Sequence, residues 1–440
     1  MDGMTMNPKL PEAFVSRMKR QLGNELPAFL NALEELPVRG IRLNTLKGTS
    51  ATEDYRKGMR IQWAPEAYEL PLESNAGSTI LHEAGAFYLQ EPGAMLPAAV
   101  LDAQPGEKVL DLCAAPGGKS TQIGIAMGGE GLLVCNEPVA KRTKILSSNI
   151  ERIGLPNTVV TSAGPEQLAE KWPDGFDAVM VDAPCSGEGM FRRVPESRAE
   201  WSEEQAHGCA QRQRGILNAA AKLIRPGGRL IYSTCTYNPE ENEENADWFL
   251  KEHTDYEAES FKCGGIDAPN GRYTCYPHKL RTEGQFVARF RRKGNGMAML
   301  NEDRSLPKPG REETAVMRSS FPLFPGPTHK LGNTLISLKE LPDLRGIRVL
   351  RAGLHLGEVR GKIAVPDHAA AMSIEPPAID VLTLEAENAC KYMAGETIEA
   401  DREGWILIRY KEMILGWGKG SGGIIRNHYP KGLRGNHFQP

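Results

Sequence analysis

Residues 108–120 read KVLDLCAAPGGKS, a short apolar run that leads into a loop of small residues and glycines. In open parallel sheets, ligands bind at such strand-to-helix turns, beyond the carboxyl ends of the strands. The loop lacks G-x-G-x-x-G, and Pro116 removes an N–H that a pyrophosphate would use. The pattern therefore predicts a cofactor without phosphates, such as S-adenosylmethionine. A purely structural glycine turn is the alternative.

Similar apolar runs follow, separated by segments with helical patterning. This alternation predicts an α/β fold of the Rossmann-like type, a parallel sheet with helices on both faces, over residues 76–293. Glu137 ends the second run, where an acid can accept hydrogen bonds from both hydroxyls of a cofactor ribose. The expected strands are KVLDLCA (108–114), GLLVCNE (131–137), TVVTS (158–162), DAVMVDA (177–183), GRLIYSTC (228–235) and FVARFRRK (286–293).

The flanking segments differ from this pattern. Residues 1–75 combine helical spacing with one strand-like stretch, which predicts an α+β extension. Residues 294–375 begin with a stretch rich in Pro, Gly and charge, and we expect a linker and a small β-rich domain. Residues 376–440 carry short strands with turns between them, which predicts a further β-rich domain.

Bulk composition sets the broad class. The chain has 440 residues, of which 40% are hydrophobic and 25% charged, values typical of a globular protein. Its net charge of −3 differs from that of a strongly basic nucleic-acid coat protein, although local basic patches remain compatible with RNA binding. Neither a membrane-spanning run nor a signal peptide is visible, and the eight scattered cysteines are typical of free thiols, so we expect a cytoplasmic protein.

Two cysteines stand out by position. DAPCSGEG (182–189) and STCTYNPEENE (233–243) begin where the fourth and fifth runs end. We therefore expect Cys185 and Cys235 to meet in one cleft beside the cofactor loop. A lone buried cysteine is usually a small core residue, but two such cysteines at successive strand ends favour function.

The chemistry that suits this pair is methylation of cytosine at carbon 5, which becomes nucleophilic once a thiolate has added to carbon 6. Asp182, with a raised pKa in a partly buried cleft, would protonate or hydrogen-bond ring nitrogen 3. A base must then remove the carbon 5 proton, and Cys185 is a candidate. Position alone leaves open which thiol attacks.

DLCAAPGGKS, DAPCSGEG and STCT-NPEENE together resemble the signature motifs of the RNA cytosine-5 methyltransferases of the NOL/NOP2/Sun type. The match is dense over about 80–293, and FYLQEPGAMLPA (87–98) extends it. GWGK (416–419) and RNHYPKGLR (426–434) are similar to the tail of the bacterial RsmF-type branch, which modifies small-subunit ribosomal RNA. That tail lies in a PUA-like RNA-binding region.

The resemblance implies residue roles. The TC cysteine, Cys235, is the nucleophile, and the PC cysteine, Cys185, assists release. Asp182 would reach the cofactor amine or the target base, and Lys119 would orient Cys235 or lower its pKa, with a helix-surface lysine as the alternative. Glu137 would hold the ribose. The residues that would line the methionine and ribose parts of the cofactor are Cys113, Ala114, Ala115, Pro116, Gly117, Gly118 and Lys119.

One departure concerns the adenine contact. Many relatives carry an acid after the third strand, whereas this chain reads TSAGPEQL (161–168). Backbone groups near Ser162 and Ala163 are an alternative, and we leave the contact unassigned.

Three further segments carry basic or aromatic residues suited to RNA. Within RGIRLNTLK (39–47), Arg39, Arg42 and Lys47 would share one RNA-facing surface, with a solvated strand face as the alternative. The loop 189–201 would clasp the RNA backbone through arginines, with a plain surface loop as the alternative. Residues 411–440 combine phosphate-binding cations with rings for base stacking. The side chains concerned are Arg192, Arg193 and Arg198 in the loop, and Lys411, Lys419, Arg426, Lys431, Arg434, Trp417, His428 and Tyr429 in the tail.

The other segments rich in acidic residues or cysteines do not predict a metal site. NPEENEEN (238–245) is best explained as a solvated helix start rather than a metal site. Cys263, Cys275 and His278 lack the paired spacing of a zinc site, so no metal is expected.

The sequence thus predicts a monomeric S-adenosylmethionine-dependent RNA (cytosine-5-)-methyltransferase that acts on ribosomal RNA or the small ribosomal subunit. The same reaction on transfer RNA is one alternative. A non-catalytic RNA-binding ribosome-assembly factor is another.

Overall fold

The computed structural model describes residues 8–302, 306–322, 324–377 and 379–439. Its centre is a nine-stranded sheet with the order β12-β13-β8-β7-β4-β5-β6-β16, and β9 pairs with β13. Strands β4 to β8 are parallel, whereas the outer strands are antiparallel to their neighbours. The bounds are β4 Lys108–Asp111, β5 Leu132–Asn136, β6 Thr158–Ser162, β7 Phe176–Asp182, β8 Ile224–Thr234, β9 Tyr256–Ala258, β12 Arg272–Cys275, β13 Gln285–Arg292 and β16 Arg348–Ala352.

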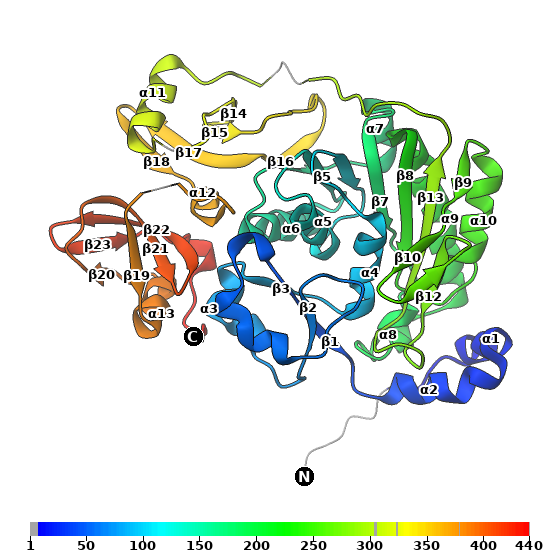
Figure 1. Cartoon of the computed structure of the whole chain (residues 1–440). Helices are drawn as coiled ribbons and strands as arrows, with labels where there is room; N and C mark the ends of the chain where they lie inside the picture. The colour runs from blue at the N-terminus through cyan, green and yellow to red at the C-terminus, as the bar shows by residue number, and fades with distance from the viewer. Residues whose placement is uncertain (1–7, 303–305, 323, 378, 440) are drawn as a thin grey trace, which may run out of the picture.

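The predicted Rossmann-like α/β fold is confirmed. From the central β4 the chain proceeds outward through β5 and β6, then crosses to β7 and β8 on the other side of β4. This reversal creates a crevice at the carboxyl ends of β4 and β7. Helices α4, α5 and α6 cover one face, and α7, α9 and α10 the other (Figure 1). Their bounds are α4 Pro92–Leu101, α5 Gly118–Ala126, α6 Ala140–Ile153, α7 Pro165–Lys171, α9 Glu203–Leu223 and α10 Glu243–Glu252.

Burial explains why these segments form strands and helices. The middle of each central strand carries apolar residues at successive positions because both sheet faces are covered; Val134 and Val179 are fully buried. In α6, by contrast, apolar residues recur at helical spacing, with Leu146 and Ile150 facing the sheet and Lys144 exposed. Among the described residues, no helix is long and apolar enough to cross a membrane.

The N-terminal part contains a three-stranded sheet of order β2-β1-β3, the short helix α3 between strands β2 and β3, and two helices at its start, α1 and α2. The helices attach to the main body through aromatic contacts, with the ring centroids of Phe14 and Phe191 5.0 Å apart. Strand β3 lies beyond residue 75, where we had placed the boundary, yet pairs with β1. The bounds are α1 Glu12–Leu22, α2 Leu26–Glu34, β1 Arg39–Leu43, β2 Ala67–Leu70, α3 Ile80–Glu83 and β3 Phe87–Leu89.

The segment 294–375 is joined to the main sheet, because β16 pairs antiparallel with β6. Its other strands form a four-stranded sheet of order β14-β15-β17-β18. The bounds of its remaining elements are α11 Arg311–Ser320, β14 His329–Leu331, β15 Thr334–Ser337, β17 Leu354–Arg360, β18 Ile363–Pro366 and α12 His368–Met372.

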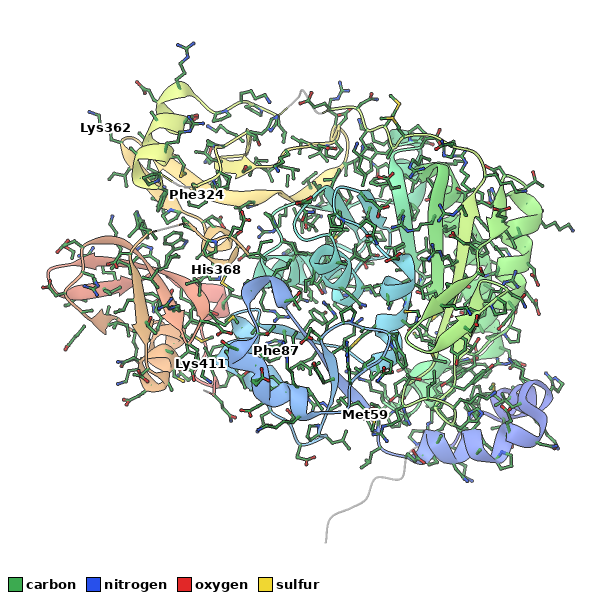
Figure 2. The ribbon with its side chains drawn as sticks, in the orientation of Figure 1. Met59, Phe87, Phe324, Lys362, His368 and Lys411 are labelled. Atoms are coloured by element: carbon green, nitrogen blue, oxygen red, sulfur yellow. The ribbon has the colours of Figure 1, made fainter. Side chains whose placement is uncertain are left out.

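The C-terminal part is a five-stranded sheet of order β19-β21-β22-β23-β20. Its apolar face shares one hydrophobic cluster with the N-terminal sheet β2-β1-β3, so these two sheets lie side by side (Figure 1). Phe87 is buried in this cluster, and Lys411 lies near the junction (Figure 2). The bounds are β19 Val381–Leu384, α13 Ala386–Ala394, β20 Ile398–Glu399, β21 Gly404–Tyr410, β22 Met413–Ser421 and β23 Ile424–Asn427.

Candidate active site

A cavity of about 290 Å³ opens at the carboxyl ends of β4, β7 and β8. Most of the expected site residues line it, although Gly117, Glu137 and Cys185 do not. The predicted residues in its wall are Cys113, Ala114, Ala115, Pro116, Gly118, Lys119, Asp182 and Cys235.

The two thiols meet at the wall of this cavity. Cys185 follows β7 and Cys235 follows β8, and their sulfur atoms are 3.3 Å apart. Parallel pairing of β7 with β8 sets Asp182 opposite Ser233, which brings both loops to the same level. All eight cysteines of the chain are free thiols.

The two thiols have different environments. The hydrogen bond with Cys235 is the largest cause that raises the pKa of Cys185 well above its usual value, and burial adds to it. Cys235 lies in the cavity wall, whereas Cys185 lies behind it. The Cys185 thiol is therefore protonated near neutral pH.

Lys119 and Asp182 form an ion pair in the cavity wall, with Nζ 2.7 Å from Oδ2. Burial lowers the pKa of Lys119, but the Asp182 carboxylate and the nearby Cys235 offset this, and the net pKa is raised. Ser233 donates to the other Asp182 oxygen at 2.7 Å. Both Asp182 oxygens thus accept a hydrogen bond.

A buried network holds the two cysteine loops together. Glu241 accepts hydrogen bonds from the Ser186 backbone N–H and from Gln213 Nε2, each at 2.9 Å. The hydroxyls of Ser186 and Thr236 are 2.9 Å apart. Because Ser186 follows Cys185 and Thr236 follows Cys235, this network fixes one thiol relative to the other.

The expectation of a solvated helix start at 238–245 was therefore wrong in part. Glu241, Asn242 and Asn245 are each at most 1% exposed. Asn242 accepts from Thr234 and donates to the Thr236 carbonyl, and Asn245 donates to Gln213. These side chains face the protein interior because they pack against α9 and the cysteine loops, which lie up to 55 residues away in sequence.

The cofactor loop is preorganised by α5 and α6. Gly117 has φ +114°, in the left-handed region that favours glycine. Arg142 donates to the Ala115 carbonyl and Asn149 to the Pro116 carbonyl, both at 2.8 Å. A Cβ on Gly118 would come within 3.2 Å of Gln90 Nε2, so the wall tolerates little beyond glycine here.

Unpaired acceptors in the cavity wall fit a cofactor that carries an ammonium group and hydroxyls. Asp111 Oδ1 and Gln90 Oε1 are buried without a hydrogen-bond partner in the described part of the chain. Burial is the largest cause that raises the pKa of Asp111 to about 7, and the nearby Asp182 adds to it. A cationic ammonium would offset the cost of this buried carboxylate. The residues thus fit S-adenosylmethionine.

Glu137 lies next to this loop but is engaged elsewhere. Its carboxylate accepts from the Val139 N–H at 2.9 Å and lies 3.3 Å from Arg142. Ribose binding at Glu137 stays a prediction. The N–H and C=O of Ala163 both bond to the side chain of Asn136, and the adenine contact stays unassigned.

Several wall residues were missed by the sequence reasoning. Glu91 caps α4 and also accepts from the Glu283 N–H at 2.6 Å, which closes the wall opposite the cofactor loop. Asp111 ends the first strand, and that position was a signal available in the sequence. The missed residues include Tyr88, Gln90, Glu91, Asp111, Met190, Glu283, Gly284 and Gln285.

The predicted RNA-facing surface of 39–47 was wrong. Arg42 is 3% exposed and donates to the Gly118 carbonyl at 3.1 Å, and Lys47 donates to the Arg152 carbonyl at 2.9 Å. Arg39 donates to carbonyls of Leu72 and Ser74. These cations connect the N-terminal sheet to neighbouring segments instead of facing solvent.

In the other two predicted RNA segments, only some of the side chains are exposed, and RNA contact there stays a prediction. Arg192 and Arg198 are buried and paired with Glu283 and Glu34, whereas Arg193 is exposed. In the tail, Trp417 and Tyr429 are 1% and 3% exposed, so neither ring is available for base stacking. The tail residues Lys411, Arg426, His428 and Lys431 are exposed.

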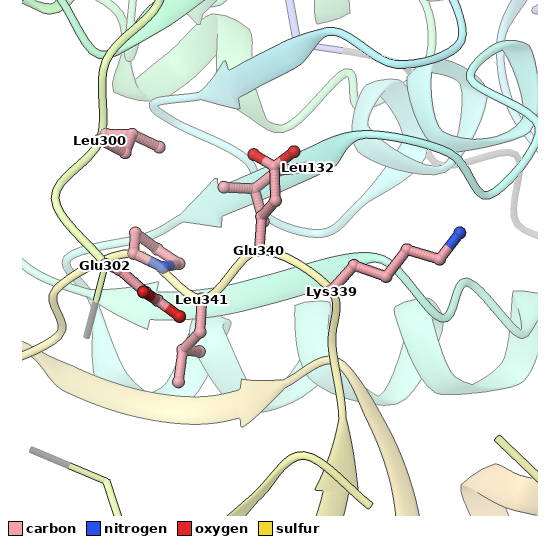
Figure 3. Close-up of a pocket in the computed structure, with 7 residues that line it drawn as sticks. Leu132, Leu300, Glu302, Lys339, Glu340 and Leu341 are labelled. Carbon is pink, nitrogen blue, oxygen red and sulfur yellow. The ribbon is translucent and has the colours of Figure 1, made fainter. Parts of the chain in front are cut away.

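A second hollow, of about 200 Å³, lies beside Leu132 (Figure 3). Leu132 begins β5, so this hollow is at the amino end of the strand, away from the edge where the thiols and the cofactor loop lie. Its charged wall residues Glu302, Lys339 and Glu340 are exposed. It is therefore separate from the cofactor cavity.

Family models match four consecutive parts of the chain. The model for 16S rRNA methyltransferase RsmB/F matches residues 98–291, and that for the N-terminal domain of 16S rRNA methyltransferase RsmF matches residues 10–92. The RsmF rRNA methyltransferase first C-terminal domain matches 316–374, and the methyltransferase RsmF PUA domain matches 380–435.

Whole-chain relatives agree with these models. Proteins named ribosomal RNA small subunit methyltransferase F from Salmonella heidelberg and Erwinia tasmaniensis are each 32% identical, over 96% of this chain and 96% of their own length. A methyltransferase homolog from Pyrococcus horikoshii has a TM-score of 0.56 at 27% identity, covering 64% of this chain and 95% of its own.

A second solved structure, NSun6 from Pyrococcus horikoshii with SFG, an analogue of S-adenosylmethionine, has a TM-score of 0.56 at 21% identity. It covers 65% of this chain and 99% of its own, and it shows the shared fold. The predicted cofactor, S-adenosylmethionine, is confirmed. The chain belongs to the family of 16S ribosomal RNA methyltransferases of the RsmB/F type.

Proposed function

We propose that this protein methylates carbon 5 of cytosine in small-subunit ribosomal RNA through a covalent bond to Cys235. The observation that carries the proposal is the pair of thiols, 3.3 Å apart, at the wall of the cofactor cavity. A methyl transfer to a hydroxyl or an amine needs no thiol, whereas carbon 5 of cytosine needs a nucleophile to activate it.

The reaction balances with these groups. S-adenosylmethionine, when bound, supplies an electrophilic methyl group. The Cys235 thiolate forms a bond to carbon 6, and the displaced electron pair moves to carbon 5, which takes up the methyl group. A base then removes the carbon 5 proton, the C5–C6 double bond re-forms, and the sulfur–carbon bond breaks to release Cys235.

The positions of the thiols favour Cys235 as the nucleophile. Cys235 lines the cavity that the base must enter, whereas Cys185 does not. The charge of Lys119 is close enough to Cys235 for the two groups to influence each other, and a cation stabilises a thiolate.

Cys185 is suited to the later proton removal. The largest cause of its raised pKa is the hydrogen bond with Cys235, and the Cys235 charge adds to it. Once Cys235 is a neutral thioether, both causes disappear, so the pKa of Cys185 falls when the adduct forms. Cys185 can then act as the base that removes the carbon 5 proton.

Asp182 and Lys119 are placed to hold the base. The Asp182 carboxylate can accept a hydrogen bond from the exocyclic amino group of cytosine, which uracil lacks. The Lys119 ammonium fixes the position of that carboxylate through their 2.7 Å contact. The Lys119–Asp182 pair thus favours cytosine over uracil. To reach this pair, the target base must leave its stack in the RNA.

The names of the relatives support the RNA class. The small-subunit name belongs to proteins that match over nearly the whole chain, including the residues matched by the PUA-domain model. Transfer RNA is the second candidate, because the cysteine motifs do not distinguish the two RNAs. A non-catalytic assembly factor would not require two adjacent thiols in the cofactor cavity.

The test is methyl transfer from labelled S-adenosylmethionine to small ribosomal subunits, naked ribosomal RNA and transfer RNA, with Cys235→Ala as the control. We expect label on ribosomal cytosine that the variant abolishes. Label on transfer RNA alone would change the substrate class, and absence of label from all three would favour the assembly factor.

A further inference from the structure

We propose that Arg193 forms a phosphate-binding subsite at the rim of the active-site cavity and holds an RNA phosphodiester beside the target nucleotide. This inference rests on the proposed function. It starts from a difference among the three arginines of the loop 189–201. Arg192 and Arg198 are buried in ion pairs, but Arg193 is exposed and lines the cavity wall.

The loop that carries Arg193 is rigidly held from both sides. Arg192 donates to Glu283 at 2.8 Å and to the Thr282 carbonyl at 2.7 Å. Arg198 donates to Glu34 and to the Phe191 carbonyl, each at 2.9 Å. The chain thus holds Arg193 on a fixed backbone, and a preorganised cation loses less entropy when it binds an anion.

The same loop is tied to the nucleophile. The Gly189 N–H donates to the Cys235 carbonyl at 2.9 Å, and the Val194 N–H donates to the Met190 carbonyl at 2.7 Å. A phosphate held by Arg193 would therefore lie at a fixed position relative to the Cys235 thiol, which attacks the base.

The other cation of the cavity wall, Lys119, is already in an ion pair, so Arg193 is the cation available to an incoming anion. Lys119 is paired with Asp182, and Glu283 with Arg192. Within the described residues, no ion pair or side-chain hydrogen bond involves Arg193. When a base leaves its stack and enters the cavity, its own phosphates remain at the rim. An arginine there can donate two parallel hydrogen bonds to phosphate oxygens.

The experiment compares Arg193→Gln and Arg193→Lys with the wild-type protein on a ribosomal RNA fragment. Arg212→Gln is the matched control, since Arg212 is an exposed arginine of α9 that does not line the cavity. RNA affinity is measured by fluorescence anisotropy over a range of KCl concentrations. Cofactor affinity is measured by calorimetry with S-adenosylhomocysteine.

We expect Arg193→Gln to weaken RNA binding about tenfold, as loss of one charge-assisted contact does. The slope of log affinity against log salt should fall by about 0.7, the value for one phosphate of a single strand. Arg193→Lys should keep the slope but lose part of the affinity, and Arg212→Gln should change neither. An uncharged methylphosphonate at the contacted position should weaken wild-type binding and leave Arg193→Gln unaffected.

Two results would overturn the inference. One is an unchanged salt slope in Arg193→Gln. The other is weaker S-adenosylhomocysteine binding with unchanged RNA binding, which would place the cofactor carboxylate, not a phosphate, at Arg193. Because these readouts measure binding, they do not depend on methyl transfer. Failure of the proposed function would appear separately, as absence of label in wild-type RNA.

Discussion

The loops of Cys185 and Cys235 follow adjacent parallel strands and carry the same reactive group, but their surroundings differ. Cys235 lines the cavity near the cation of Lys119. Cys185 lies behind it, in a loop held by Glu241, and its pKa is raised chiefly by Cys235 itself. Because the two thiols have different environments, we expect different results when each of the two loops is changed.

The largest effect should come from Cys235→Ala. Loss of the nucleophile should reduce kcat by about 10⁴-fold or more, as removal of a catalytic nucleophile does elsewhere. Affinity for S-adenosylhomocysteine, measured by calorimetry, should stay unchanged because the cofactor loop does not depend on this thiol. Residual turnover within tenfold of wild type would show that Cys235 is not the nucleophile.

Cys185→Ala should give a different phenotype. Without the base, turnover should fall by about 10²- to 10⁴-fold. The adduct between Cys235 and RNA should accumulate, and it is detected as a band that resists denaturant on an electrophoretic gel. Cys185→Ala,Cys235→Ala is the control, and it should show no such band. If Cys185→Ala alone forms no adduct, Cys185 is not the base that allows Cys235 to be released.

Asp111→Asn tests the cofactor side of the cavity. Asp111 has a pKa of about 7 in the free protein, and its charged form would pair with the cofactor ammonium. Raising the pH through 7 ionises the carboxyl, so cofactor affinity should increase from pH 6 to pH 8. The variant should bind about tenfold more weakly at pH 8, the size of one charge-assisted contact.

The Asp111→Asn variant is itself the control for this pH dependence. It lacks the Asp111 carboxyl, so its change in cofactor affinity with pH reports the titration of the ligand. In Asp111→Asn the affinity profile should lose the component near pH 7. If wild type and variant show parallel profiles in calorimetry, Asp111 does not contact the ammonium.

Glu241→Gln should have the smallest effect. The amide keeps the size of the side chain, but only one of its two terminal groups accepts hydrogen bonds. In Glu241 both oxygens accept, Oε2 from the Ser186 N–H and from Gln213, and Oε1 from the Ser186 hydroxyl. We expect the free energy of unfolding to fall by about 1–3 kcal/mol, measured by urea denaturation. Adduct formation at Cys235 should persist. A variant as stable as wild type would show that this network does not hold the loops.

The sequence predicted the central fold well because strand burial is a local pattern. The runs that end at Asp111 and Asp182 are apolar and short, and all parallel strands present their carboxyl ends at one edge. The motifs after these strands could therefore be placed together before any contact was known. The meeting of Cys185 and Cys235 follows from that geometry.

The errors concern polar side chains whose partners are distant in the chain. Arg42 bonds to Gly118, and Lys47 to Arg152, so both cations look solvent-facing when only neighbouring residues are considered. Trp417 and Tyr429 look like stacking platforms for the same reason, yet they are buried. The hydrophobic periodicity of the sequence cannot reveal such burial, because the burial depends on which domain packs against which face of the element.

The most direct test of the central claim uses RNA in which the target cytosine carries fluorine at carbon 5. Fluorine cannot be removed as a proton is, so the covalent adduct cannot resolve after methyl transfer. Mass spectrometry of the digested complex then identifies the attached residue. We expect the nucleotide on Cys235 in the wild-type protein. Attachment to Cys185, or no covalent complex despite methylation of unmodified RNA, would contradict the account.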